Sequence, residues 1–351
     1  MGQPQQLTTK KATINDVAEQ AGVSIKTVSR VLNREPKVRD STRERVEEAM
    51  KRLNYRPNSP GRMLAGSRTY LLGLIYNANS SYSASIQNGV LKTCRQEHYD
   101  LLIHPCTYTD PTLLEQITEL VTAPRVDGLL LIPPIADLTA VRQTVRQLNI
   151  PSVAMSSEPQ EPGDWTVGTN DRQVCREMVR HLVRLGHQKI AFVSGHPDHR
   201  AMANRHRGYL EGMADAGLKV RKSHVIQGGN TYESGIDCAV RLLRLAQRPT
   251  AIFCANDHMA AGVIKVAHET GLKIPSDLSI AGFDDIPMAS QIWPALTTVR
   301  QPLDEMASAA ARLLIDALQG QSVPQLNPVV EATIVARDST GPAPRTEADR
   351  G

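Results

Sequence analysis

The sequence lacks the cysteine and histidine patterns that form disulfide bonds in small secreted proteins or bind a structural metal ion. Its cysteines form no C-x-x-C pair and are odd in number, so no disulfide framework is indicated. Its ten histidines form no H-x-x-x-H or H-E-x-x-H motif. We therefore expect reduced, mostly buried thiols, no metal site and no other cofactor. The five cysteines are Cys94, Cys106, Cys175, Cys238 and Cys254.

Enzyme and membrane signatures are also missing. There is no G-x-x-x-x-G-K-[ST], no G-x-G-x-x-G after a strand and no G-x-S-x-G, so phosphate-loop, dinucleotide and hydrolase sites are not indicated. The polar N-terminus has no apolar region of signal-peptide type, and no apolar stretch is long enough to span a bilayer. The sequence predicts a cytoplasmic protein that is not an enzyme and has no membrane partner.

Charge is distributed unevenly along the 351 residues. Residues 1–70 carry 14 Lys and Arg against 7 Asp and Glu, a net charge of +7. Because the whole chain has a net charge of +4, the remainder carries −3. A basic head on a mildly acidic body is typical of a nucleic-acid-binding module joined to a domain that need not touch nucleic acid, although many solvated helices are also basic.

Apolar spacing in ATINDVAEQAGVSIKTVSRVLN predicts two short helices. The first ends at Gly22, which takes a left-handed conformation without steric cost. Ser24 occupies the N-cap position of the second, which ends near Leu32. A third helix, capped at Asp40 or Ser41, closes a small core. The layout is that of a helix-turn-helix, whose second helix enters the major groove, or of a small bundle with a solvated basic face. The outward face of the second helix presents Ile25, Lys26, Thr27, Ser29 and Arg30.

The string D-V-A-x-x-A-G-V-S-x-x-T-V-S-R-V-L-N, followed by R-x-R-V-x-x-A-M-x-x-L-N-Y-x-P-N, closely resembles the head of the LacI/GalR family of repressors. The resemblance implies that Ile25 and Lys26 choose the operator sequence and that Arg30 contacts a base. It also implies that the remaining polar positions and Tyr55 belong to the DNA-binding face, as phosphate contacts or helix caps. These positions are Thr13, Ser24, Thr27, Ser29, Asn33 and Asn58.

In this family the stretch after the head is a hinge that becomes helical on the operator. The resemblance assigns Leu64, flanked by Ala65, as the apolar wedge that enters the minor groove. Pro60 and Gly61 depart from the helix formers that the family more often has there. The alternative is that residues 58–68 form only a linker between the head and the body.

From Tyr70 onward, near-continuous apolar runs alternate with helix-length amphipathic segments, which indicates parallel sheets covered on both faces. The chain forms two similar halves, about 70–155 and 165–285, and Leu303–Leu318 is a predicted helix. The fold class is therefore an α/β body of two subdomains, with two doubly wound parallel sheets, behind a small all-α helix-turn-helix domain. This body resembles type I periplasmic binding proteins, the sensor body of the LacI/GalR family.

Ligands of open α/β sheets bind beyond the carboxyl ends of strands, where this chain is strongly polar. The resemblance assigns Arg205 to clamp a hydroxyl or carboxylate, and Asn256 and Asp284 to bind hydroxyls. Without the resemblance, Arg205 could equally form a buried structural ion pair and Asp284 a strand-end turn. The full set of effector-binding positions that we expect is Asn77, Tyr82, Ser156, Arg205, Asn230, Asn256 and Asp284.

Two of these positions depart from the usual sugar-sensing pattern. Asn230 stands where many members have an aromatic ring, and Ser156 where the family often has an aspartate. The ligand class is therefore less firmly indicated than the fold.

The predicted domain boundaries follow from these patterns. We expect an arm at 1–11, a head at 12–57, a hinge at 58–69, a body at 70–338 and a disordered Pro- and Gly-rich tail at 339–351. Within the body we expect an N-subdomain of about 70–160 and 286–300, and a C-subdomain of about 161–285 and 301–338.

The resemblance implies a repressor that binds a pseudo-palindromic double-stranded DNA operator as a homodimer. A small-molecule effector, a sugar or sugar derivative, would control its operator affinity. The alternative is a solute-binding protein without DNA function, which the body would permit and the basic head argues against.

Overall fold

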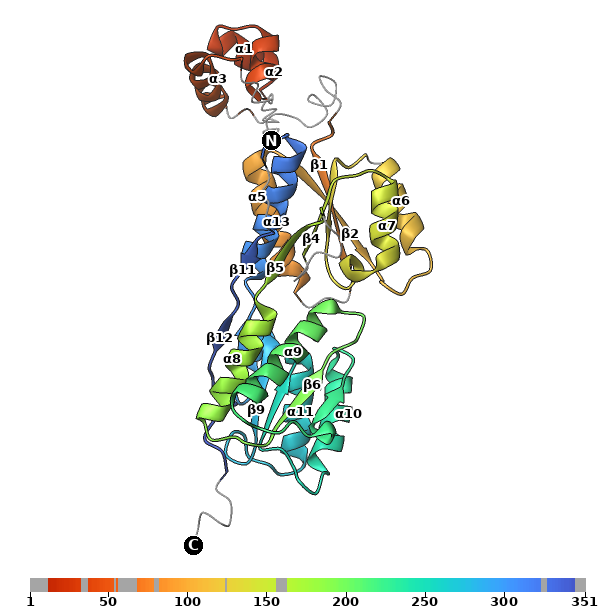
Figure 1. The fold of residues 1–351 in the computed structure, drawn as a ribbon. Helices are drawn as coiled ribbons and strands as arrows, with labels where there is room; N and C mark the ends of the chain where they lie inside the picture. The colour runs from red at the N-terminus through yellow and green to blue at the C-terminus, as the bar shows by residue number, and fades with distance from the viewer. Residues whose placement is uncertain are drawn as a thin grey trace, which may run out of the picture.

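The computed structural model describes residues 12–32, 37–53, 55, 68–78, 82–123, 125–155, 163–322 and 327–344. Its described parts are a small helical head and an elongated body of two lobes stacked end to end (Figure 1). The predicted arm at 1–11, most of the hinge, and Asn33, Asn58, Leu64, Ala65 and Ser156 lie outside the described residues.

The head contains the predicted helix-turn-helix. Thr13 and Asp16 form a reciprocal capping box at the start of α1 (Ile14–Ala21), and Gly22 ends this helix with φ +63°. The hydroxyl of Ser24 accepts a hydrogen bond from the amide of Thr27 at 3.1 Å, so it caps α2 (Ile25–Leu32) as expected. α3 (Asp40–Arg52) begins one or two positions earlier than a cap at Asp40 or Ser41 would place it, because Arg39 is the N-cap residue.

One side of each helix forms the core of the head. Its fully buried side chains are small, and larger, partly buried side chains such as Leu32, Met50 and Leu53 pack around them. Its buried members are Val17, Ala18, Ala21, Val28, Val31, Val46 and Ala49.

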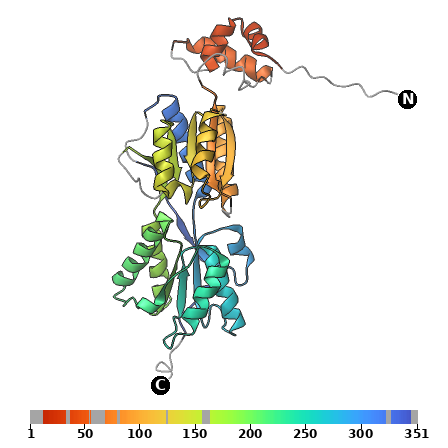
Figure 2. The same ribbon diagram turned by 90° about the vertical axis from the view of Figure 1, so that its right-hand side faces the viewer.

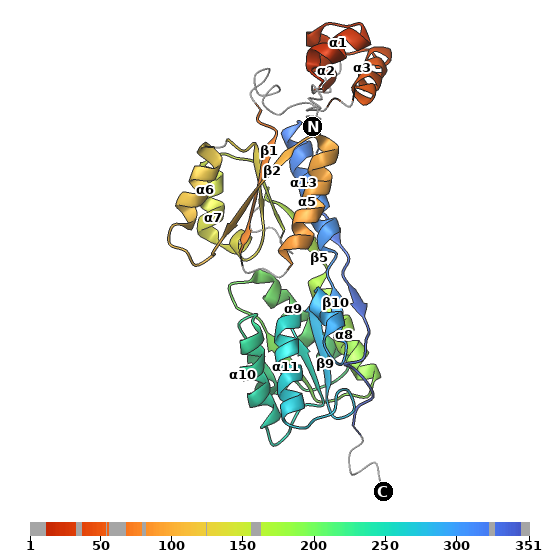
Figure 3. The same cartoon turned by 180° about the vertical axis from the view of Figure 1, so that it is seen from behind.

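The upper lobe of the body is a six-stranded sheet with strand order β11-β5-β4-β3-β1-β2, and its pairs are parallel. α5 (Ser83–Glu97) and α13 (Leu303–Leu318) cover one face, and α6 (Leu113–Thr122) and α7 (Thr139–Gln147) cover the other (Figures 1 and 3). The strands are β1 (Leu71–Asn77), β2 (Asp100–Cys106), β3 (Gly128–Leu131), β4 (Ser152–Met155), β5 (Trp165–Thr169) and β11 (Val329–Val330).

The lower lobe is a second six-stranded sheet with order β12-β10-β9-β8-β6-β7, parallel except for β12. Its helices are α8 (Asp171–Arg184), α9 (Arg200–Asp215), α10 (Tyr232–Leu243), α11 (Asp257–Glu269) and the short α12 (Pro287–Gln291). Its strands are β6 (Ile190–Ser194), β7 (Val225–Gln227), β8 (Ala251–Cys254), β9 (Ser279–Asp284), β10 (Thr297–Arg300) and β12 (Thr333–Val335).

The chain crosses between the lobes three times, after β5, after β10 and after β11 (Figure 2). The predicted subdomain boundaries are therefore wrong in their last parts. Residues 286–300 belong to the lower lobe, because Thr298 pairs with Gly282 of β9. Residues 303–318 belong to the upper lobe, because α13 packs against α5 so closely that a Cβ on Gly89 would lie 2.3 Å from the carbonyl oxygen of Asp304.

The predicted disordered tail is also wrong for residues 339–344. Ser339 is fully buried, and its hydroxyl accepts from the amide of Thr297 at 2.8 Å and donates to the carbonyl of Ile280 at 2.6 Å. The carbonyl of Gly341 lies 3.0 Å from Nε2 of the buried His187, and Ala343 donates to the carbonyl of Leu185. Composition suggested disorder because the segment is polar and small, but its polar groups satisfy buried partners in the lower lobe.

Candidate effector site and DNA-binding face

The carboxyl ends of both sheets face a cavity of about 310 Å³ between the two lobes. An apolar wall comes mainly from the upper lobe, and most polar groups come from the lower lobe. Six of the predicted effector residues line it: Asn77, Tyr82, Arg205, Asn230, Asn256 and Asp284. The seventh, Ser156, lies outside the described residues.

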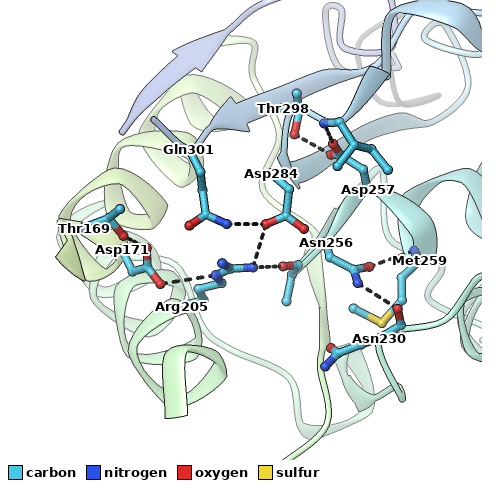
Figure 4. Close-up of polar contacts among 12 residues, drawn as sticks. Thr169, Asp171, Arg205, Asn230, Asn256, Asp257, Met259, Asp284, Thr298 and Gln301 are labelled. Carbon is cyan, nitrogen blue, oxygen red and sulfur yellow. Dashed lines mark hydrogen bonds and ion pairs between the residues drawn. The ribbon is translucent and has the colours of Figure 1, made fainter. Parts of the chain in front are cut away.

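Arg205, on α9, is the centre of the polar wall (Figure 4). Its Nε lies 3.3 Å from a carboxylate oxygen of Asp171, and its Nη1 lies 3.4 Å from one of Asp284. Nη1 also donates to the carbonyl of Ala255 at 2.5 Å, and the guanidinium carbon lies 3.6 Å from the centre of the Phe283 ring. The arginine is only 4% exposed, so its charge is neutralised by protein groups in a place with little water.

Asp284 ends β9 with φ +116°, a conformation that is rare for a residue with a side chain. Its carboxylate accepts a hydrogen bond from the side-chain amide of Gln301 at 2.6 Å as well as from Arg205. Burial raises the pKa of this carboxyl to about 6, although Arg205 and Gln301 lower it. The backbone is held in this geometry with the side chain directed at the cavity rather than into a turn.

The amides Asn256 and Asn230 organise the opposite side of the polar wall (Figure 4). Asn256 caps α11, since its Oδ1 accepts from the amide of Met259 at 2.9 Å. Its Nδ2 donates to the carbonyl of Asn230 at 2.9 Å. Asn230 has φ +66°, and its Oδ1 accepts from the amide of His196 at 3.2 Å. Both amides therefore have structural partners, and their contact with an effector stays a prediction.

Two contacts join the lobes at the cavity. Oδ2 of Asp137, from the upper lobe, accepts from the amide of Arg200 at 3.1 Å and so caps α9, which has no side-chain cap of its own. The ring of Tyr108 lies 6.2 Å from the ring of His199, measured between centroids, and nearly perpendicular to it. Burial is the main reason why the pKa of Asp137 rises to about 6 and that of His199 falls to about 4.

Sequence reasoning missed several residues that line the cavity. Thr169 is the last residue of β5 and Asp171 follows this strand, but WTVGT is not a near-continuous apolar run, so the rule of looking beyond strand ends did not reach either residue. Gln301 follows β10, whose sequence TTVR is likewise no near-continuous apolar run. Asp137 lies in a 3-10 turn with no motif to mark it. The missed residues that the geometry singles out are Asp137, Thr169, Asp171, His196, His199 and Gln301.

Asp257 lies fully buried behind the cavity, at the start of α11. It accepts hydrogen bonds from the hydroxyl of Thr298 at 2.5 Å and from the amide of Ile286 at 2.9 Å. Burial, and then the nearby Asp284 carboxylate, raise the pKa of Asp257 from 3.8 to about 8.

This raised pKa predicts a pH-dependent stability of the body. The folded protein holds the proton of Asp257 more tightly than the unfolded chain, so the contribution is complete below about pH 4 and is lost as the pH rises through about 8. We expect the free energy of unfolding to fall as the pH rises from about 4 to about 8, and the part of the fall between about pH 6 and 8 lies above the raised pKa values of Asp137 and Asp284. Asp257→Asn should flatten this dependence in urea titrations, and an unchanged slope would contradict the assignment.

The second helix of the head carries the predicted DNA-binding residues on its outer side. Ile25 is 49% exposed, which is unusual for an isoleucine, and Lys26 and Arg30 are exposed. Thr27 and Ser29 are half-buried, and Thr13 and Ser24 act as helix caps. Tyr55 packs against the core of the head. The remaining DNA-binding positions lie outside the described residues.

Neither a metal site nor a membrane span is indicated in the described part of the chain. No group of three or more potential metal-ligating side chains occurs there, and no helix is long and apolar enough to cross a bilayer. All five cysteines are buried and free.

A helix-turn-helix head followed by a two-lobed body with a cavity between the lobes is the architecture of a ligand-responsive DNA-binding regulator. Residues 13–58 match the family of bacterial regulatory proteins named after lacI, and residues 179–340 match a periplasmic binding protein-like domain. The chain is 32% identical over 314 residues to the transcriptional repressor PurR of Photobacterium profundum, covering 89% of this chain and 93% of that protein. It is 33% identical over 313 residues to catabolite control protein A of Priestia megaterium, covering 89% and 94%.

Solved structures show the same relation over most of the chain. The lac repressor dimer bound to operator and the anti-inducer ONPF superimposes with a TM-score of 0.72, at 29% identity over 95% of this chain and 100% of that one. The regulator CelR in complex with cellobiose gives 0.71 at 28% identity over 93% and 99%. The protein belongs to the LacI family. It is a DNA-binding transcriptional repressor with an effector-binding domain, and not an enzyme.

Proposed function

We propose that this repressor is controlled by a sugar or sugar derivative that binds in the cavity between the two lobes. The observation that carries the proposal is the cavity itself, whose lining comes from both lobes while three chain crossings connect them. A ligand there contacts both lobes at once, so its affinity depends on how the lobes are placed. An effector changes operator affinity only through such a difference in affinity between two states.

The composition of the cavity supports a polyhydroxy ligand. Amide, carboxylate and guanidinium groups from Asn77, Arg205, Asp284 and Gln301 provide directional donors and acceptors, and the apolar wall includes Ile132 and Met306. Sites of this kind bind small molecules with a few well-placed polar groups. The structural relative solved with cellobiose supports the same ligand class.

The DNA side of the proposal rests on the head. A homodimer places two heads on a pseudo-palindromic operator in the cytoplasm, with Ile25 and Lys26 selecting bases and Arg30 donating to a base edge. The positions that contact the DNA phosphates or cap helices are Thr13, Ser24, Thr27, Ser29, Asn33, Tyr55 and Asn58. Leu64, flanked by Ala65, enters the minor groove at the centre of the site.

The test joins operator selection to effector screening. Duplexes that the protein selects from a random-sequence pool are expected to be pseudo-palindromic. A sugar that stabilises the protein to heat is expected to change the affinity of the protein for these duplexes by at least about tenfold, or 1.4 kcal/mol. Arg30→Ala should weaken the selected duplex by about 1–3 kcal/mol more than random DNA. Arg241→Ala, an exposed arginine on the body, is the matched control. Recovery of no common sequence would contradict the base-selecting roles proposed for Ile25, Lys26 and Arg30.

A further inference from the structure

The electrostatic character of the cavity narrows the class of effector further. Among the described residues that line it, Arg205 is the one with a permanent positive charge. The segments 79–81 and 156–162, which follow β1 and β4, contain no lysine or arginine in their sequences. Among the described lining residues, the permanent positive charge that could attract an anion is therefore this guanidinium.

That guanidinium is already compensated. Asp171 and Asp284 both contact Arg205, so the three groups together carry a net charge of −1 when both carboxyls are ionised. Their side chains are at most 8% exposed, so water does little to screen this charge. An anionic ligand group that approaches Arg205 also approaches two carboxylates.

The remaining lining residues do not reverse this balance. Asp137 adds a third carboxylate on the upper-lobe side of the cavity, and the two arginines that lie close enough to lower its pKa, Arg142 and Arg200, do not line the cavity. His199 and His258 have lowered pKa values, mainly because of burial, so neither supplies a full positive charge at neutral pH. The pKa values of Asp137 and Asp284 are themselves raised to about 6, chiefly by burial. The environment of each of these two carboxyls therefore already disfavours a negative charge.

We propose that the effector carries no anionic group: the cavity accepts an uncharged polyhydroxy compound and excludes sugar phosphates and sugar acids. Asp137, Asp171 and Asp284 are the residues that set this selectivity, by repelling a further negative charge in a site with little water. This inference rests on the proposed function, because it concerns the ligand of the same cavity.

The first experiment compares matched sugars by thermal shift of the full-length protein. Each set contains a neutral sugar, its uronate and its terminal phosphate, such as glucose, glucuronate and glucose 6-phosphate, with corresponding sets for other hexoses and for ribose. In any set that stabilises the protein, the neutral member is expected to bind at least about tenfold more tightly, equivalent to 1.4 kcal/mol. Stronger binding of a uronate or phosphate would overturn this inference and leave the proposed function standing. No stabilisation by any set would overturn both.

The second experiment changes the selectivity through one carboxylate. Asp137→Asn removes a charge but keeps an oxygen that can accept from the amide of Arg200. We expect it to improve binding of the anionic members relative to the neutral member by about tenfold, since an ionised carboxylate that lines the cavity repels an anion bound there. Asp237→Asn makes the same change of total charge at an exposed position on α10 that does not line the cavity, and should leave the ratio unchanged. An equal ratio in wild type and Asp137→Asn would show that the carboxylates do not select the ligand.

Discussion

Replacing Arg205 with alanine is expected to lower the free energy of unfolding of the body by about 3–5 kcal/mol, in addition to any loss of effector binding. The substitution leaves the carboxylates of Asp171 and Asp284 buried without their shared cation. It also removes a donor to the carbonyl of Ala255 and the contact with the Phe283 ring. A loss of ligand response in this variant would therefore not by itself prove that Arg205 touches the ligand.

Urea titration followed by tryptophan fluorescence measures this effect in the body, because Trp165 and Trp293 are the two tryptophans of the chain. The matched control is Arg172→Ala, whose side chain is 56% exposed and pairs with Glu211 on the neighbouring helix. Exposed pairs of this kind contribute about 0–1 kcal/mol. Combining Arg205→Ala with Asp171→Asn and Asp284→Asn should recover part of the loss. Equal losses of stability for the two arginine variants would mean that Arg205, Asp171 and Asp284 do not form a buried ion cluster.

Replacing Val28 with aspartate is expected to abolish sequence-specific operator binding, a loss of at least about 100-fold, while the body stays folded. Val28 is fully buried in the seven-residue core of the head. An unpaired buried carboxylate costs several kcal/mol, and a domain of this size rarely has more than about 3–5 kcal/mol of stability. The head therefore unfolds, and its recognition helix is lost.

Fluorescence and operator titration together test this expectation, because both tryptophans lie in the body and should report an unchanged transition. Gln20→Asp adds the same charge at an exposed position of α1. It should weaken DNA binding only through salt-dependent electrostatics. Specific binding that survives in Val28→Asp would contradict the view that this core holds the head together.

The elements were predictable from the sequence where apolar periodicity was long or strong. The helix at 303–318 and the helix-turn-helix with its caps at Gly22 and Ser24 were predicted correctly. The lobe to which α13 belongs was not predicted correctly. The apolar face of α13 packs against α5, which lies about 200 residues earlier in the chain. Local pattern carries no information about such a partner.

The cavity was predictable to a similar extent. Six expected residues line it because strand ends converge there, but Asp171 was missed together with the short strand before it. The sequence left open whether Arg205 forms a structural ion pair or faces the ligand site. The structure shows that it forms the pair and lines the cavity, since its ion partners are themselves part of the polar wall.

The buried hydrogen bonds of Ser339 and Gly341 determine where the chain can be truncated or joined to a tag. A truncation at residue 338, where composition alone placed the end of the body, removes the hydroxyl that bridges Thr297 and Ile280 and the carbonyl that meets His187. Expression vectors for the isolated body should therefore retain residues 339–344 and attach affinity tags after Gly351, so that the fusion point lies beyond the residues that close the lower lobe.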